Sequence, residues 1–182
     1  MEHLRIATTW LGGCSGCHMS FLDLDELLID LAQQVDVVYS PIVDTKEYPE
    51  NVDLVLIEGA VCNQDHIELA YKIRARTKVV VAFGDCAVTG NVTAIRNQLG
   101  LGNAENVLQR AYVEAADMNK GIPKEPGIVP PLLDKVLPLH QVIHVDHYLP
   151  GCPPSAERIG MFLEQVVAGN EPVLTGQNLK FG

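Results

Sequence analysis

The sequence has few basic residues. Lys and Arg together account for 13 of the 182 residues, against 23 Asp and Glu, and the formal net charge is −10 at pH 7. Nucleic-acid binding depends on cationic side chains that neutralise phosphates, so this excess of negative charge repels nucleic acid on average. We therefore expect no nucleic acid among the partners of this chain.

Long hydrophobic runs are also missing. A helix needs about 20 consecutive apolar residues to span a bilayer, and the longest candidates here are interrupted by Asp, Glu, Gly or Pro. The amino end leads directly from Met1–His3 into an apolar run, with neither the basic start of a signal peptide nor a twin-arginine pair. These features predict a cytoplasmic protein with no direct membrane insertion.

Segments with the apolar pattern of strands alternate with segments that have helical periodicity. We predict strands at 4–11, 35–39, 52–57, 78–83 and 141–147, and helices at 20–34, 64–76, 88–99 and 154–168. The continuous Val, Leu and Ile of several strands are typical of a sheet covered on both faces. The fold class is therefore α/β: one domain over 1–182, a flavodoxin-like doubly wound parallel sheet of five strands with helices on both faces.

One stretch, 100–138, interrupts this alternation. It contains Pro123, Pro126, Pro130, Pro131 and Pro138 together with scattered Gly. Such residues break regular elements, so we predict an irregular insertion before the last strand, with one helix around 106–116.

Five cysteines in a cytosolic chain are better explained as metal ligands or catalytic thiols than as disulfides, because the cytosol keeps thiols reduced. Cys14 and Cys17 follow the first predicted strand, Cys86 follows the fourth and Cys152 follows the fifth. In an open parallel sheet the loops at the carboxyl ends of the strands meet at one edge. We therefore expect these four thiols to converge.

Glycines accompany each of these cysteines and allow the backbone to approach a bulky ligand; they are Gly12, Gly13, Gly16, Gly84 and Gly151. A cubane iron–sulfur cluster is such a ligand. The fifth thiol, Cys62, follows the third strand, and we interpret it as a buried small hydrophobe, with an auxiliary role at the site as the alternative.

Three other interpretations use the same residues. A C-x-x-C pair also occurs in zinc sites and in thioredoxin-like redox sites. A zinc site usually has its other two ligands close together in sequence, whereas Cys86 and Cys152 are far apart. A thioredoxin-like site leaves Cys86 and Cys152 unexplained. A flavodoxin-like sheet can bind FMN at its switch point. The first loop offers two cysteines rather than the Ser and Thr of a phosphate site, so we retain FMN only as an additional ligand.

Two further side chains are candidates for the site. His18 adjoins Cys17 and could donate a hydrogen bond to a cluster or thiolate sulfur, while a solvated histidine is the alternative. Glu58 ends the third strand and could relay protons at a subunit boundary, while a capped or solvated carboxylate is the alternative.

Three motifs together resemble the small-subunit signature of nickel–iron hydrogenases. Residues 10–17 read Trp-Leu-Gly-Gly-Cys-Ser-Gly-Cys, residues 84–87 Gly-Asp-Cys-Ala, and residues 150–154 Pro-Gly-Cys-Pro-Pro, with Glu58-Gly59 between the first two. The order of these motifs is far more specific than any one of them. The resemblance implies that Cys14, Cys17, Cys86 and Cys152 bind one proximal 4Fe–4S cluster, while the nickel–iron site lies in a separate large subunit.

Two differences from the periplasmic nickel–iron hydrogenases narrow the group of hydrogenases that this chain resembles. The sequence shows no twin-arginine leader and no carboxyl-terminal cysteines for further clusters. It is therefore most similar to the small subunit of cytoplasmic bidirectional hydrogenases, which implies diaphorase iron–sulfur and flavin subunits that react with NAD or NADP. The cluster subunit of quinone-linked NADH dehydrogenase is the runner-up, but that protein carries adjacent cysteines where Cys14 and Cys17 are separated by two residues.

Overall fold

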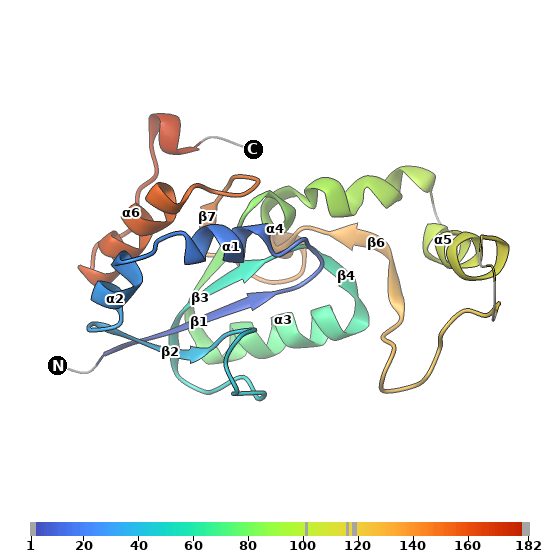
Figure 1. Ribbon diagram of the computed structural model, residues 1–182, viewed down its shortest axis with the longest axis horizontal. Helices are drawn as coiled ribbons and strands as arrows, with labels where there is room; N and C mark the ends of the chain where they lie inside the picture. The colour runs from blue at the N-terminus through green and yellow to red at the C-terminus, as the bar shows by residue number, and fades with distance from the viewer. Residues whose placement is uncertain (1–2, 101, 116, 118–119, 180–182) are drawn as a thin grey trace.

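A computed structural model describes residues 3–100, 102–115, 117 and 120–179. Its centre is a sheet of five parallel strands in the order β2-β1-β3-β5-β7, the flavodoxin-like order that the sequence predicts (Figure 1). These strands are β1 (Leu4–Trp10), β2 (Val35–Tyr39), β3 (Val52–Glu58), β5 (Thr77–Phe83) and β7 (His147–Leu149).

Helices cover both faces of the sheet (Figure 1). The helices are α1 (Gly16–Leu22), α2 (Leu27–Leu31), α3 (Gln64–Arg76), α4 (Asp85–Thr89), α5 (Asn103–Gln109) and α6 (Ala156–Val167), with 3₁₀ helices at Asn91–Leu99, Leu139–Gln141 and Gly176–Leu179. One apolar core lies between α3 and the sheet, and a second lies between the sheet and the layer of α1, α2 and α6. No helix in the described ranges is both long and apolar enough to cross a membrane.

Residues 54–57 of β3 are continuously apolar because both faces of the strand are covered. Leu54 and Leu56 belong to the core under α6, whereas Val55 and Ile57 belong to the core under α3. All four side chains are almost completely buried. Successive side chains of a strand point to opposite faces, so a strand covered on both faces needs apolar residues at every position.

Two predicted helices are interrupted. The sequence predicts one helix over 20–34, but α1 begins earlier, at Gly16, and a turn with Asp25 in the left-handed region (φ 51°) separates it from α2. The segment 88–99 is a 3₁₀ helix from Asn91, separated from α4 by Gly90 at φ 86°. In both places the apolar spacing is helical, but a local left-handed residue breaks the hydrogen-bond ladder.

The insertion at 100–138 contains more regular structure than the sequence predicts. Helix α5 continues into a π-helical turn at Arg110–Glu114, which covers most of the predicted helix, although Ala116 lies outside the described residues. Strand β6 (Leu132–Leu137) pairs antiparallel with β4 (Val61–Asn63). Sequence reasoning misses both strands, because β4 is only three residues long and β6 lies between prolines. The pair and α5 extend beyond the central sheet (Figure 1).

The fifth strand is shorter and later than predicted, because 141–146 does not join the sheet as a strand. Ile143 and Val145 are buried in the core beside α3, which accounts for their strand-like alternation. Asp146 then meets β5 through its backbone N–H, which donates to the Val80 carbonyl (2.9 Å), and through its side chain, which accepts from the Val80 N–H (2.7 Å). A carboxylate therefore takes the place of a backbone acceptor, and strand pairing starts only at His147.

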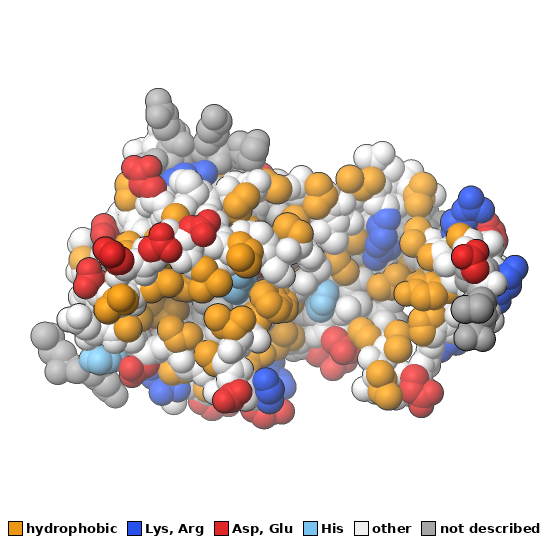
Figure 2. All heavy atoms as spheres, in the orientation of Figure 1, with side chains coloured by type: hydrophobic (Ala, Val, Ile, Leu, Met, Phe, Trp, Pro, Cys, Tyr) orange, Lys and Arg blue, Asp and Glu red, His pale blue; other side chains and the backbone are white. Residues whose placement is uncertain are grey.

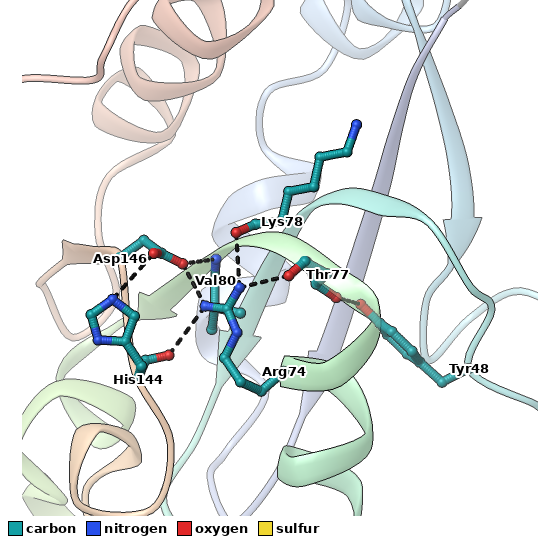
Figure 3. A network of polar contacts seen from close by, with 7 residues as sticks. All are labelled: Tyr48, Arg74, Thr77, Lys78, Val80, His144 and Asp146. Atoms are coloured by element: carbon teal, nitrogen blue, oxygen red, sulfur yellow. Dashed lines mark hydrogen bonds and ion pairs between the residues drawn. The ribbon is translucent and has the colours of Figure 1, made fainter.

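Arg74 at the end of α3 fixes this arrangement (Figure 3). Its guanidinium donates to the Asp146 carboxylate (2.6 Å) and to the carbonyls of His144, Thr77 and Lys78 (3.3, 2.6 and 2.8 Å). Partial burial alone would raise the pKa of Asp146, but the hydrogen bond from Val80 and the ion pair with Arg74 outweigh it and lower that pKa. The start of β5, the end of α3 and the segment before β7 are thus joined by one cation.

We expect Asp146→Asn to lower the free energy of unfolding by about 1–3 kcal/mol at pH 7, since it removes a charge-assisted partner of Arg74 and Val80. A lowered carboxyl pKa stabilises the fold above the ordinary value of about 3.9, and this contribution is lost as the pH falls through the lowered pKa. The difference between the two proteins in urea denaturation should therefore shrink in acid. The exposed Asp36→Asn on β2 is the control, with an effect within about 0.5 kcal/mol; an equal loss in both variants would contradict the role of the Arg74 contacts.

Candidate metal centre

The loop after β1 carries the first two cysteines. Gly12 exchanges backbone hydrogen bonds with Ala60 (2.9 and 2.8 Å), and the chain then turns through Ser15, whose φ of 65° is left-handed, into α1. Cys14 is exposed just before the helix, and Cys17 is buried in its first turn. The two-residue spacing thus places one thiol on the loop and the other under the start of the helix.

Glu58, the last residue of β3, anchors that first turn. Its carboxylate is 2% exposed and accepts hydrogen bonds from the backbone N–H groups of Cys17 (3.4 Å) and His18 (3.0 Å). The Nδ1 atom of His18 lies 2.5 Å from the same carboxylate. A helix start has unpaired N–H groups that favour an anion, so Glu58 fills a position that a ligand phosphate would otherwise take.

The third and fourth cysteines follow β5 and β7, and the two segments that carry them are hydrogen-bonded to each other. Cys86 is buried in α4, two residues after Gly84, and Cys152 is exposed after β7. Between them, the Asp85 N–H donates to the Gly151 carbonyl (2.9 Å), and the Gly151 N–H donates to the buried Asp85 carboxylate (2.6 Å). This reciprocal pair fixes the relative position of the two loops.

Other polar contacts hold the same region. The Ser20 hydroxyl of α1 donates to the Pro154 carbonyl (2.6 Å), so the third loop is also tied to the helix that carries Cys17. The Asn91 amide donates to the Cys152 sulfur (3.4 Å). Thr93 donates through its hydroxyl to the Gly12 carbonyl (3.1 Å) and also hydrogen-bonds Cys86.

The Cys17 and Cys86 thiols both lie near enough to those of Cys14 and Cys152 to interact with them electrostatically. Burial, the Glu58 carboxylate and the charges of Cys86, Cys14 and Cys152 all raise the pKa of Cys17. Burial is also the main cause of the raised pKa of Cys86; Cys152 and Cys14 raise it further, while hydrogen bonds with Thr93 lower it. Thiols in such surroundings resist ionisation until a bound metal supplies positive charge, and a coordinating thiol is deprotonated outright.

Two glycines explain how the loops can approach so closely. A Cβ atom at Gly84, which has φ 81°, would lie 2.2 Å from the Cys17 sulfur, and one at Gly16 would lie 3.2 Å from the Cys14 sulfur. The unpaired, buried Nε2 atom of His18 adds a polar atom without a partner beside Cys17. Four thiols, a glycine-lined approach and an unsatisfied nitrogen fit a bulky sulfur-rich group. In the part of the chain that the structure describes, no three His, Cys, Asp or Glu side chains are grouped to hold a single metal ion.

Cys62 lies behind the first loop, and its thiol also interacts electrostatically with that of Cys86. Its sulfur is 2.1 Å from where a Cβ of Gly12 would be, and its S–H donates to the Ala60 carbonyl (3.2 Å). Its backbone N–H donates to His66 (3.2 Å). Burial raises the pKa of the Cys62 thiol to about 11, against a lowering by the charge of Arg96. These contacts suit a small, packed thiol, as the sequence indicates.

Sequence reasoning misses Asp85, Asn91 and Thr93 as members of this site. Asp85 lies between Gly84 and Cys86 of the second cysteine motif, and this position is the sequence signal that could have identified it. No sequence signal points to Asn91 or Thr93, because their positions depend on the turn at Gly90, where α4 ends.

The sequence family described as NADH ubiquinone oxidoreductase, 20 Kd subunit, matches residues 14–166. One subunit of the F420-non-reducing hydrogenase of Methanothermobacter marburgensis is 38% identical over 186 residues, which cover 98% of this chain and 58% of that protein. The delta subunit of the NAD-reducing hydrogenase HoxS of Cupriavidus necator is 36% identical over 170 residues, covering 91% of this chain and 79% of that protein.

Among solved structures, the crystal structure of an NAD⁺-reducing [NiFe]-hydrogenase in the H₂-reduced state contains a similar chain. Its TM-score is 0.92 at 40% identity, with 100% of both chains covered. The chain spans 58% of the length of the methanogen relative. The chain therefore belongs to the family of the NADH ubiquinone oxidoreductase 20 Kd subunit, and the similarity to hydrogenase small subunits that its three cysteine motifs predict is confirmed.

Proposed function

We propose that this chain is the electron-transfer small subunit of a cytoplasmic nickel–iron hydrogenase. In this proposal it forms one domain that binds a single 4Fe–4S cluster through Cys14, Cys17, Cys86 and Cys152. The observation that supports the proposal is that Cys17 and Cys86 interact electrostatically with Cys14 and Cys152, on segments that follow the carboxyl ends of β1, β5 and β7. When bound, a 4Fe–4S group accepts and returns single electrons.

The protein residues around the thiols have three tasks. The pair formed by Asp85 and Gly151 holds two ligand loops at a fixed separation. Asn91 donates to the Cys152 sulfur, and hydrogen bonds to ligand sulfurs raise the reduction potential of iron–sulfur sites. Glu58 fixes the first turn of α1, so that Cys17 and His18 keep their orientation. A proton relay through Glu58 remains a prediction.

The exposure of the thiols supports a partner on one side of the site. Cys14 and Cys152 are exposed, whereas Cys17 and Cys86 are buried. An electron donor or acceptor can therefore approach from the side of Cys14 and Cys152. We propose a nickel–iron large subunit as one partner and diaphorase iron–sulfur and flavin subunits, reacting with NAD or NADP, as the others. Permanent assemblies of this kind bury more than about 2,000 Å².

The structure disfavours FMN at the first loop. A flavin phosphate would use the N–H groups at the start of α1, but two of them already donate to the buried Glu58 carboxylate. A phosphate there would meet another anion in a buried place, which is unfavourable. We therefore assign no flavin to this loop.

A quinone-linked NADH dehydrogenase-type complex is the second candidate. The family match to the 20 Kd subunit of NADH ubiquinone oxidoreductase favours it. The hydrogenase proposal is preferred because Cys14 and Cys17 are not adjacent and because the NAD⁺-reducing hydrogenase chain matches over its whole length.

Native purification of the chain with its companions tests the proposal. Iron, sulfide, nickel and flavin are measured, and the co-purifying chains are identified. We expect iron and sulfide with this chain, and nickel in a companion, since the hydrogen chemistry lies in the large subunit. A nickel-free preparation with quinone-reactive membrane companions would instead establish the second candidate.

A further inference from the structure

A deep apolar groove lies beside the site, between the sheet and the helices α1 and α2. Its volume is about 460 Å³, and every lining residue except Leu163 comes from the segment 6–43. The groove exists because α1 and α2 are short and separated by a turn, so they cover only part of the β1–β2 face. Apart from His18, no side chain that lines it is ionisable.

Large apolar side chains around the groove are exposed. Ile42 is 69% exposed, Met19 60% and Val37 50%, and Leu22 and Trp10 are also exposed. Figure 2 shows hydrophobic side chains gathered on this face, over the region of α1, α2 and β2. Contiguous apolar patches on a protein surface mark binding sites more often than single exposed residues do.

The exposed charge near the groove is mainly negative. Five exposed carboxylates lie in the segments around it, at Asp23, Asp25, Glu26, Asp30 and Asp44, and the exposed Lys46 follows them. Asp36 points to the other face of the sheet, because Val35 and Val37 on either side of it line the groove. A row of acidic side chains borders the apolar area in Figure 2. An occupant that buries the apolar surface must therefore tolerate or neutralise a negative rim.

We propose that the groove binds a segment of a partner subunit, an amphipathic helix that is apolar on one face and carries Lys or Arg along its flanks. The apolar face would fill the groove, with anchors at helical spacing, and the cations would meet the acidic rim. The inference rests on the proposed function only in that the partner is taken to be another subunit of the same assembly.

The same charges argue against other occupants. A second copy of this chain would bring its own acidic rim against the first, in a protein whose net charge is already −10. A membrane with anionic lipids would be repelled by the same carboxylates. A helix with Lys or Arg on its flanks would instead be attracted to these carboxylates.

The position of the groove suits an assembly contact. Ser15 and His18 line it and also adjoin Cys14 and Cys17. A helix seated there would cover the helix that carries Cys17, while leaving the Cys86 and Cys152 loops to other contacts. The occupant would thus be a neighbour of the electron path.

Photo-crosslinking in the native assembly tests the inference. Ile42 is replaced by p-benzoylphenylalanine, and the same replacement at Ile128, which is 76% exposed in the segment before β6, is the control. We expect the Ile42 position, and not Ile128, to cross-link to one apolar peptide with flanking Lys or Arg from a companion chain. Cross-links to a second copy, to lipid, or to nothing in an intact assembly would overturn the inference.

A second measurement does not depend on cross-linking chemistry. Ile42→Glu adds a carboxylate at the groove and should weaken association with the companions roughly tenfold or more, and wild-type association should weaken as salt rises. Ile128→Glu should leave both unchanged. Iron content distinguishes failure of this inference from failure of the proposed function. If Ile42→Glu keeps its iron and associates as the wild type does, only the groove inference is wrong. If the wild-type chain contains no iron and has no companions, the proposed function is wrong too.

Discussion

Cys86→Ala is expected to leave the chain without its iron–sulfur cluster. Cys86 is buried in α4, and its thiol interacts with those of Cys14 and Cys152. In the proposed site, loss of this thiolate would leave one iron without a protein ligand, and Cys62 is the remaining cysteine that could replace it. Iron and sulfide should fall to near zero, and the paramagnetic signal of the reduced protein should disappear.

Cys62→Ala is the matched control for this loss. Cys62 is partly buried and lies in β4, shortly after β3 of the central sheet, and its sulfur contacts the Ala60 carbonyl and the backbone at Gly12. We expect full iron and sulfide and an unchanged signal. If both variants keep their iron, or if Cys62→Ala loses it and Cys86→Ala does not, the assignment of ligands is wrong.

Gly84→Ala is expected to have the second largest effect. The new Cβ would lie 2.2 Å from the Cys17 sulfur, and φ of 81° is strained for any L residue. Backbone strain and displacement of Cys17 together should cost about 2–4 kcal/mol of unfolding free energy, and most of the iron should be lost. Denaturant titration and iron analysis measure the two effects separately.

Gly169→Ala is the control that separates the effect of backbone strain from the effect of the contact with Cys17. Gly169 also has a positive φ, of 73°, but no atom lies within 4 Å of its Cβ position. It should cost only about 1–2 kcal/mol and keep its iron. Equal iron in the two alanine variants would show that Cys17 is not held against Gly84.

The fold is largely predictable because its strongest signals are local. β3 and β5 are covered on both faces, so their central residues are continuously apolar, while β1 mixes Ile, Ala, Thr and Trp, and the turns after all three strands contain Gly. The sequence does not show the break at Asp25, because the spacing of Leu24, Leu28 and Leu31 is helical on both sides of it. It does not show the late start of β7 either, because Ile143 and Val145 alternate like a strand but pack as an irregular segment held by Arg74.

The candidate site is only partly predictable. Cysteines are rare, and strand order alone brings Cys14, Cys86 and Cys152 to one edge of the sheet. The supporting contacts depend on distances between loops far apart in sequence, such as the bond between Asp85 and Gly151. The sequence suggests Glu58 as a proton relay, which stays a prediction. The structure adds that its carboxylate accepts hydrogen bonds from the first turn of α1, a contact that the sequence does not reveal.

The two ends of the sheet are held by different kinds of bond. At the start of β5, Arg74 joins three segments through protein atoms alone. At the other end, an inorganic group bound by the four thiols would act as a cross-link between loops that enclose most of the chain, from Cys14 to Cys152. Metal loss should therefore loosen the molecule from one end only, with slow amide exchange persisting near Arg74 while the ligand loops open.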